Sequence, residues 1–151
     1  MALTDFCPSH DEKVQLFGLL LEVNARLARD LGATLEAECE LPLAWFEVLL
    51  RLRRAPEGRL RVSEIADAIV HSNGGTTRLV DRMEAAGLVA RRMCPSDRRA
   101  VHVAITGDGD ARLDEALAVH VAFLDASLGR HLDATERATL GMLLGKLRDA
   151  D

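Results

Sequence analysis

The chain has 151 residues, enough for one compact domain, and 48% of them are hydrophobic, enough to build a core. No apolar run is long enough to span a bilayer, and the first residues lack the basic and apolar regions of a signal peptide, so we expect a cytoplasmic protein with no membrane partner. The net charge of −5 does not by itself favour a nucleic-acid partner.

The N-terminal part predicts a flexible tail, residues 1–10, followed by one long helix within residues 11–40. Hydrophobic side chains recur there at three- and four-residue steps, the period of a helix face. They are Val14, Phe17, Leu20, Leu21, Leu27, Ala28, Leu31 and Leu35. Since so long a helix carries more apolar surface than a small monomer can cover, we expect it to form part of a homodimer interface.

Two shorter helices are predicted next. Pro42 suits the first turn of a helix that extends to about Arg54, and the residues Ala-Pro-Glu-Gly at 55–58 end it. The second short helix opens at residues 62–64. Ser63 is its expected N-cap, and Glu64 complements the positive end of the helix dipole.

A break at residues 71–75 precedes a helix with a polar outer side. Ser72 or Asn73 can cap this helix. Its apolar stripe consists of Leu79, Val80, Met83 and Ala86, and its solvent side of Thr77, Arg78, Asp81 and Arg82. Gly87 is the expected left-handed residue at its end, with Leu88 closing onto Met83.

The hydrophobic period then changes to two. Residues 88–93 and 100–105 predict the strands of a β-hairpin, joined by a charged turn at 94–99. Thr106 can cap a long helix that continues to about residue 130. Asp133 and Glu136 have the spacing of a capping box for a last helix.

The predicted fold is therefore mainly α with a small β-hairpin wing (α+β). The element order is that of a winged helix-turn-helix, residues 41–106, flanked by the N-terminal dimerisation helix and by C-terminal dimerisation helices in residues 107–151.

The distribution of charge favours DNA as the partner of this module. Residues 51–99 contain eleven of the nineteen basic residues and six of the 24 acidic ones, a net charge of +5 against −10 for the remainder. Gly74, Gly75 and Thr76 are small enough for close approach to DNA, and Arg78 has the forked donor geometry for a guanine edge or a phosphate. Further backbone contacts are expected from Arg51, Arg53, Arg54, Arg59 and Arg61.

Three motifs in this region resemble the MarR family of bacterial transcription factors. TRLVDRMEAAGLVARR, from Thr77 to Arg92, is similar to the recognition helix and first wing strand of that family. Asp97-Arg98-Arg99-Ala100 is similar to its wing tip, and ITGDG, from Ile105 to Gly109, to its Leu-Thr-x-x-Gly entry into the next helix. Thr76 departs from the pattern, because an apolar residue is usual there.

The resemblance implies a homodimer, held together by the first and last two helices, that represses transcription from a pseudo-palindromic operator in double-stranded DNA. Each recognition helix would enter a major groove and each wing a minor groove. Carried over by position, the DNA contacts are Ser72, Asn73, Gly74, Gly75, Thr76, Thr77, Arg78, Arg82, Arg98 and Arg99. Asp97 is the expected wing-positioning residue, holding Arg82 or a neighbouring wing arginine.

A small-molecule effector, such as a phenolic or other aromatic acid, is also implied by the resemblance. Trp45 lies on the helix expected to line the ligand cleft, and His71, His102 and His120 are further candidates. The alternatives are a redox sensor acting through Cys7 or Cys39 and a zinc sensor using Cys7 and His10.

No catalytic motif, cofactor motif or clustered metal-ligand pattern is present in the sequence, so we expect neither an enzyme nor a bound cofactor or metal. A winged-helix protein–protein interaction module without DNA binding is the remaining alternative.

Overall fold

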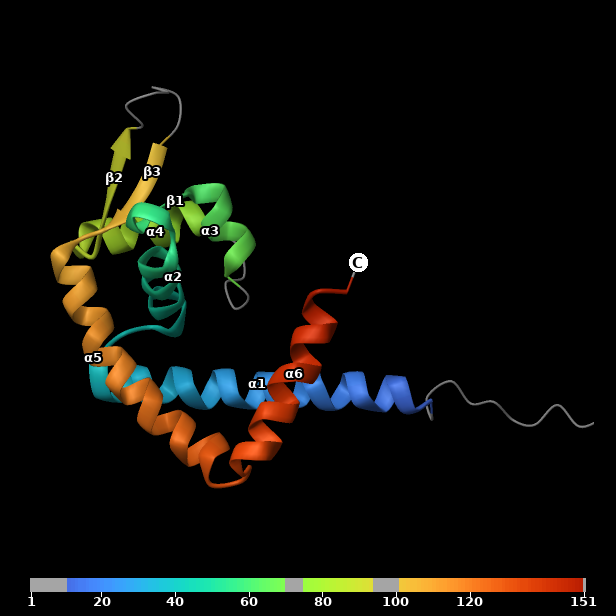
Figure 1. Ribbon diagram of the computed structural model, residues 1–151. Helices are drawn as coiled ribbons and strands as arrows, with labels where there is room; N and C mark the ends of the chain where they lie inside the picture. Colours follow the sequence, from blue (N-terminus) through green and yellow to red (C-terminus); the bar gives the residue numbers. More distant parts are fainter. Residues whose placement is uncertain (1–10, 70–74, 94–100, 151) are drawn as a thin grey trace, which may run out of the picture.

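A computed structural model describes residues 11–69, 75–93 and 101–150 (Figure 1). Its elements, in chain order, are α1 (Glu12–Cys39), α2 (Leu43–Arg54), a short 3₁₀ turn (Pro56–Gly58), β1 (Arg59–Arg61), α3 (Val62–Ala68), α4 (Thr76–Ala85), β2 (Val89–Met93), β3 (Val101–Ile105), α5 (Gly107–Leu124), a π-helical turn (Asp125–Gly129) and α6 (Ala134–Arg148).

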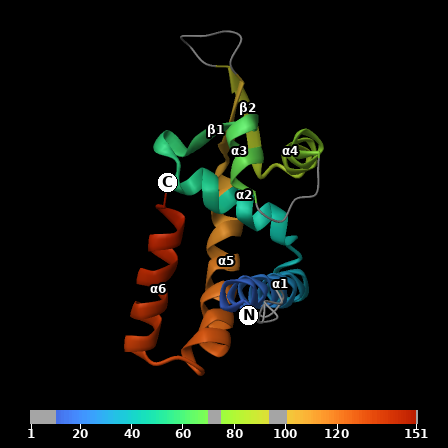
Figure 2. The same ribbon diagram turned by 90° about the vertical axis from the view of Figure 1, so that its right-hand side faces the viewer.

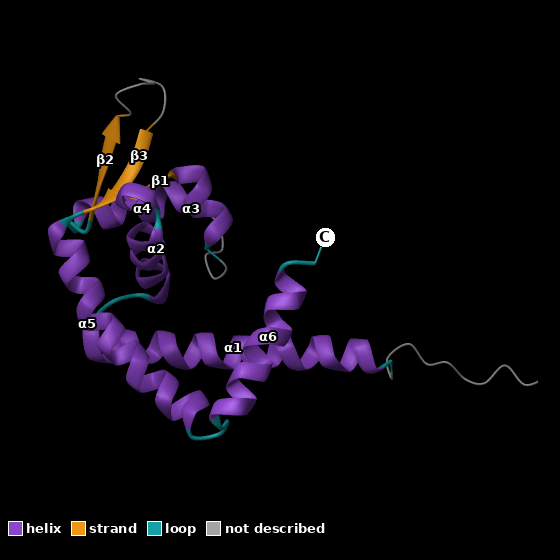
Figure 3. Ribbon diagram, viewed as in Figure 1, coloured by secondary structure: helices purple, strands orange, loops and turns teal. Residues whose placement is uncertain are grey.

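The elements form two parts that α5 connects. Helices α2, α3 and α4 and the small sheet make one lobe, whereas α1, the end of α5 and α6 make the other (Figures 1 and 3). The expectation of a mainly helical fold with a β-hairpin wing is confirmed. The sheet differs from the predicted hairpin in one respect, because β1 adds a third strand in the antiparallel order β1-β3-β2.

A single aliphatic core holds the winged lobe together and joins it to α5. Leu49 and Leu52 of α2, Val80 and Met83 of α4 and Leu113 of α5 are all fully buried. Each comes from the apolar stripe of an amphipathic helix, so burying these stripes against one another is what sets the orientation of α4.

Helices α1 and α6 leave most of their apolar surface uncovered. Only Leu35 and Cys39 are buried among the 28 residues of α1, and α6 has no buried residue. Their exposed apolar side chains include Val14, Leu16, Phe17, Leu19, Leu21, Val23, Leu140, Met142, Leu143, Leu144 and Leu147. Helix α6 follows the π-helical turn at the end of α5, and Figures 1 and 2 show it running back from that turn past α1. None of the described helices is both long and apolar enough to cross a membrane.

Several predicted helix ends are confirmed, and others differ. The Thr106 hydroxyl accepts from the backbone N–H of Gly109 at 3.0 Å, and the Asp133–Glu136 capping box is present. Ser63 does not cap α3. The N-cap is Arg61, whose backbone N–H donates to the Glu64 carboxylate at 2.6 Å. Helix α5 also ends at Leu124, and the π-helical turn fills the rest of the predicted length.

Candidate DNA-binding surface

Helix α4 turns one face to the core and the other to solvent. Leu79, Val80 and Met83 are buried, whereas Thr77, Arg78, Asp81 and Arg82 are exposed, as the sequence predicts. Ala86, also predicted in the apolar stripe, is exposed. Among the described residues, neither Arg78 nor Arg82 has an ion-pair partner on the protein. The guanidinium of Arg78 is therefore available for a contact outside the protein. Side chains early in a recognition helix meet base edges, so a base is the expected partner.

The first turn of α4 has no side-chain cap. Its N-cap is Gly75, in the left-handed region at φ 83°, and not Ser72 or Asn73 as predicted. Ser72, Asn73 and Gly74 lie outside the described residues, Thr76 is half-buried, and Thr77 is exposed. Backbone N–H groups at a helix N-terminus with no capping side chain can donate to a phosphate oxygen.

The far end of α4 closes as predicted. Gly87 is in the left-handed region at φ 76°, the N–H of Leu88 donates to the Met83 carbonyl at 3.0 Å, and the N–H of Gly87 donates to the Glu84 carbonyl at 2.9 Å. This Schellman arrangement turns the chain directly from α4 into β2. The wing strand is therefore attached to the recognition helix by a very short connection.

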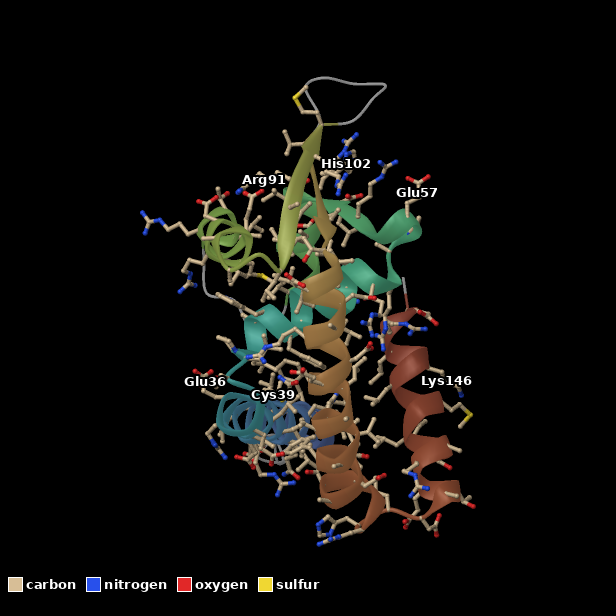
Figure 4. All side chains as sticks on the ribbon, turned by 90° about the vertical axis from the view of Figure 1, so that its left-hand side faces the viewer. Glu36, Cys39, Glu57, Arg91, His102 and Lys146 are labelled. Carbon is tan, nitrogen blue, oxygen red and sulfur yellow. The ribbon has the colours of Figure 1, made fainter. Side chains whose placement is uncertain are left out.

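Arg91 of β2 locks the wing strand onto α4. Its guanidinium lies 2.5 Å from a carboxylate oxygen of Asp81 and 2.5 Å from one of Glu84, and its backbone N–H donates to Glu84 at 2.8 Å. The backbone N–H and then the guanidinium of Arg91 hold the pKa of the Glu84 carboxyl below its usual value. Figure 4 shows Arg91 on the side of the hairpin that faces α4. These bonds fix the angle between helix and wing.

Sequence reasoning assigned Arg91 no role beyond its place in the family motif. Strand alternation puts it on the same face as Val89, which is buried, and an arginine on a buried strand face is a signal for a charged partner nearby. The predicted wing contacts Arg98 and Arg99, and Asp97, lie outside the described residues.

Arg53 is half-buried and ion-paired within the protein, and its expected DNA-backbone contact stays a prediction. Its guanidinium reaches the Asp110 carboxylate at 2.7 Å, the Asp110 carbonyl at 2.6 Å and the Asp114 carboxylate at 2.5 Å. Arg59 likewise pairs with Glu57. The Arg53 contacts fasten α2 to the start of α5, and thus the winged lobe to the helical one.

Two adjoining cavities of about 200 Å³ each lie between α1, α2 and α5. Shared lining residues are Leu31, Leu43, Glu47 and His120, and Phe46, Arg51 and Arg54 line the first cavity. The His120 ring meets Phe46 edge-on at 5.0 Å, and burial, together with the charge of Arg54, lowers the pKa of His120.

Trp45 is half-buried, packs against the core and is not among the residues that line these cavities. Its role as a ligand contact stays a prediction. Among the other histidine candidates, His102 is on the sheet, and His71 lies outside the described residues.

Cys39 is buried at the end of α1, and burial raises the pKa of its thiol, which disfavours the reactive thiolate. Cys7, His10 and Cys94 lie outside the described residues. Within residues 11–69, 75–93 and 101–150, no group of three or more His, Cys, Asp or Glu side chains is arranged to hold a metal ion.

A helix with an exposed cationic outer face, joined by one tight turn to a β-hairpin that is ion-paired to it, defines a winged helix-turn-helix DNA-binding module. Comparison with known proteins supports this class. The sequence profile of the MarR family matches residues 40–100. The multiple antibiotic resistance protein MarR of Salmonella typhimurium is 31% identical over 137 residues, which cover 91% of this chain and 93% of that protein.

The chain therefore belongs to the MarR family and is a DNA-binding transcriptional regulator rather than an enzyme. The transcriptional repressor MdtR of Bacillus subtilis is 35% identical over 77 residues, which span 48% of its length.

Solved structures of two relatives resemble this one closely. A mutant MarR from E. coli, complexed with operator DNA, is 29% identical with a TM-score of 0.76, covering 90% of this chain and 95% of that one. BpsR of Bordetella bronchiseptica, whose structure concerns regulation of its DNA binding by 6-hydroxynicotinic acid, is 27% identical with a TM-score of 0.76, covering 95% and 96%.

Proposed function

We propose that this regulator is a repressor that binds a pseudo-palindromic operator as a homodimer, with α4 in the major groove and the wing in the minor groove. The observation that carries the proposal is the exposed outer face of α4, where Arg78 stands one turn from an uncapped helix N-terminus. The Arg91 ion pairs hold the wing strand at a fixed angle to that helix. The likeness to a MarR protein complexed with operator DNA supports the same mode of binding.

A second copy of the chain is the proposed partner of the uncovered apolar face. A groove of about 340 Å³ between α1 and α6 is lined almost entirely by leucines: Leu16, Leu20, Leu140, Leu143, Leu144 and Leu147. Exposed apolar surface on this scale is unfavourable in a monomer. Pairing through it gives two copies of α4 related by a two-fold axis, as a palindromic site requires.

A small anionic ring compound is the proposed signal, bound in the cavities between α1, α2 and α5. The first cavity combines the apolar Leu31 and Phe46 with the cationic groups of Arg51 and Arg54, against one acidic side chain, Glu47, which lines both cavities. Because α2 belongs to the winged lobe and α1 to the other lobe, a ligand between them changes the angle at which α4 meets DNA. Regulation of BpsR by an aromatic acid supports this ligand class.

Fluorescence anisotropy with duplexes from the region upstream of the chain's own gene tests the proposal. We expect one duplex to bind far more tightly than a scrambled duplex of equal length, with affinity falling steeply as salt rises. A panel of hydroxylated aromatic acids should weaken that binding, and Arg54→Gln should blunt the effect. Equal binding to operator and scrambled DNA would contradict sequence-specific recognition, and binding to neither would favour the protein–protein interaction module.

A further inference from the structure

The outer face of the three-stranded sheet presents a row of basic side chains that no part of the proposed function uses. In the strand register, Arg61 of β1 is opposite His102 of β3, and His102 is opposite Arg92 of β2. Residues directly opposite one another in antiparallel strands share a face. Arg61, His102 and Arg92 therefore form one line across all three strands, which we call the outer row.

The two faces of the sheet differ in how their charges are balanced. On the inner face, Val89 and Val103 are buried and Arg91 is neutralised by two carboxylates of α4. On the outer face, Arg61 and Arg92 are exposed, and neither has an ion-pair partner among the described residues. Figure 4 places His102 on the side of the hairpin away from α4, toward Glu57.

The outer row gathers two exposed arginines on one face of the sheet. Arg61 and Arg92 lie on the two edge strands, with His102 of the central strand between them. Glu64 accepts from the backbone N–H of Arg61 at 2.6 Å and Glu57 is paired with Arg59, so neither carboxylate is ion-paired with the guanidinium of Arg61 or Arg92. The buried Nδ1 of His102 has no hydrogen-bond partner in the described part of the chain, so an internal hydrogen bond does not account for its position either. An anion above the row would pair with these two exposed guanidinium groups.

We propose that the outer row binds the phosphate backbone of the operator just beyond the bases that α4 reads. The inference rests on the proposed function, in which the hairpin enters a minor groove. A minor groove is only about 6 Å wide, so a hairpin inserted in it faces one phosphate strand on each side. The inner face of the sheet faces α4. The outer face points away from α4, toward the part of the duplex beyond the bases that α4 reads. The outer row thus extends the DNA interface beyond the wing.

Salt dependence tests the contact, because each phosphate contact adds about 0.9 to the slope of log K against log salt. With a fixed random-sequence duplex, Arg61→Gln/Arg92→Gln removes four contacts from the dimer and should lower the slope by about 3.6 units. Arg61→Lys/Arg92→Lys keeps the positive charges and should therefore keep most of the wild-type slope. The control Arg29→Gln/Arg148→Gln makes the same charge change at exposed sites on α1 and α6 and should leave the slope unchanged.

Duplex length tests where the contact lies. On duplexes trimmed from both ends of the upstream site, the wild type should lose affinity a few base pairs earlier than Arg61→Gln/Arg92→Gln, which has no outer contact to lose. The inference is wrong, and the proposed function still stands, if the glutamine variant keeps the wild-type slope or if the control lowers the slope equally. The inference is also wrong if trimming affects the wild type and the glutamine variant alike. If the wild type binds no duplex, the proposed function fails first.

Discussion

At the scale of single residues, Arg91 is the side chain on which the geometry of the DNA-binding surface depends most. It bonds to both Asp81 and Glu84 of α4. We predict that Arg91→Met lowers operator affinity several-fold, because the wing loosens and two carboxylates are left unbalanced beside DNA. Glu84→Gln should lower operator affinity less in the Arg91→Met background than in the wild type, because the Arg91–Glu84 ion pair is already broken there. Strict additivity in a double-mutant cycle would show that the two residues act independently.

His120 makes stability depend on pH. Burial, and then Arg54, lower its pKa from the ordinary value of 6.5, so the folded protein binds a proton at this ring less readily than the unfolded chain does. As pH falls through that value, the unfolded chain takes up the proton first and gains relative stability. We predict that the stability advantage of wild type over His120→Gln shrinks between about pH 7.5 and pH 5.5. Urea unfolding at fixed protein concentration measures it, and a constant difference would contradict the assignment.

Residue roles were predictable where they follow from local spacing and not where they depend on distant partners. The exposed face of α4, with Arg78, follows from helical periodicity alone. Arg53 was predicted to contact DNA because it stands in an arginine run, but its partners are 57 and 61 residues away in sequence. No local pattern reveals such a pair.

At the scale of elements, the junction between β2 and α5 depends on Gly109. A Cβ there would overlap the backbone carbonyl oxygen of Leu88. We predict that Gly109→Ala destabilises the protein by about 1–3 kcal/mol, the usual range for overpacking. Gly107→Ala is the matched control, since nothing lies within 4 Å of a Cβ at that position. It should be neutral or slightly stabilising. Urea midpoints that move equally for the two variants would rule out the steric explanation.

The elements that sequence patterns missed are those too short to show a period. Strand β1 has only three residues, and its hydrogen bonds to β3 join segments more than 40 positions apart. The cap of α3 was misplaced for a related reason. Ser63 is a favourable N-cap residue, yet pairing of β1 with β3 keeps the chain extended through Arg61, so α3 starts at Val62.

At the scale of the whole molecule, the leucine groove between α1 and α6 predicts an obligate dimer. Leu144→Glu/Leu147→Glu places two charges in it and should give monomeric or aggregated protein in sedimentation equilibrium. Operator affinity should fall about 100-fold or more as the two half-sites become uncoupled. Ala138→Glu, at an exposed position of the same helix outside the groove lining, should remain dimeric. A folded double variant that is monomeric yet binds with full affinity would refute the dimer proposal.

The central proposal is that α4 reads operator bases, and Arg78→Ala tests it most directly. The measurement is fluorescence anisotropy on operator and scrambled duplexes, with Arg148→Ala, on exposed α6, as the control. One bidentate base contact contributes about 1–3 kcal/mol of discrimination for each half-site. We therefore predict that Arg78→Ala weakens operator binding at least ten-fold more than binding to scrambled DNA, while Arg148→Ala changes neither. Equal loss on the two duplexes, or no loss on either, would contradict the account.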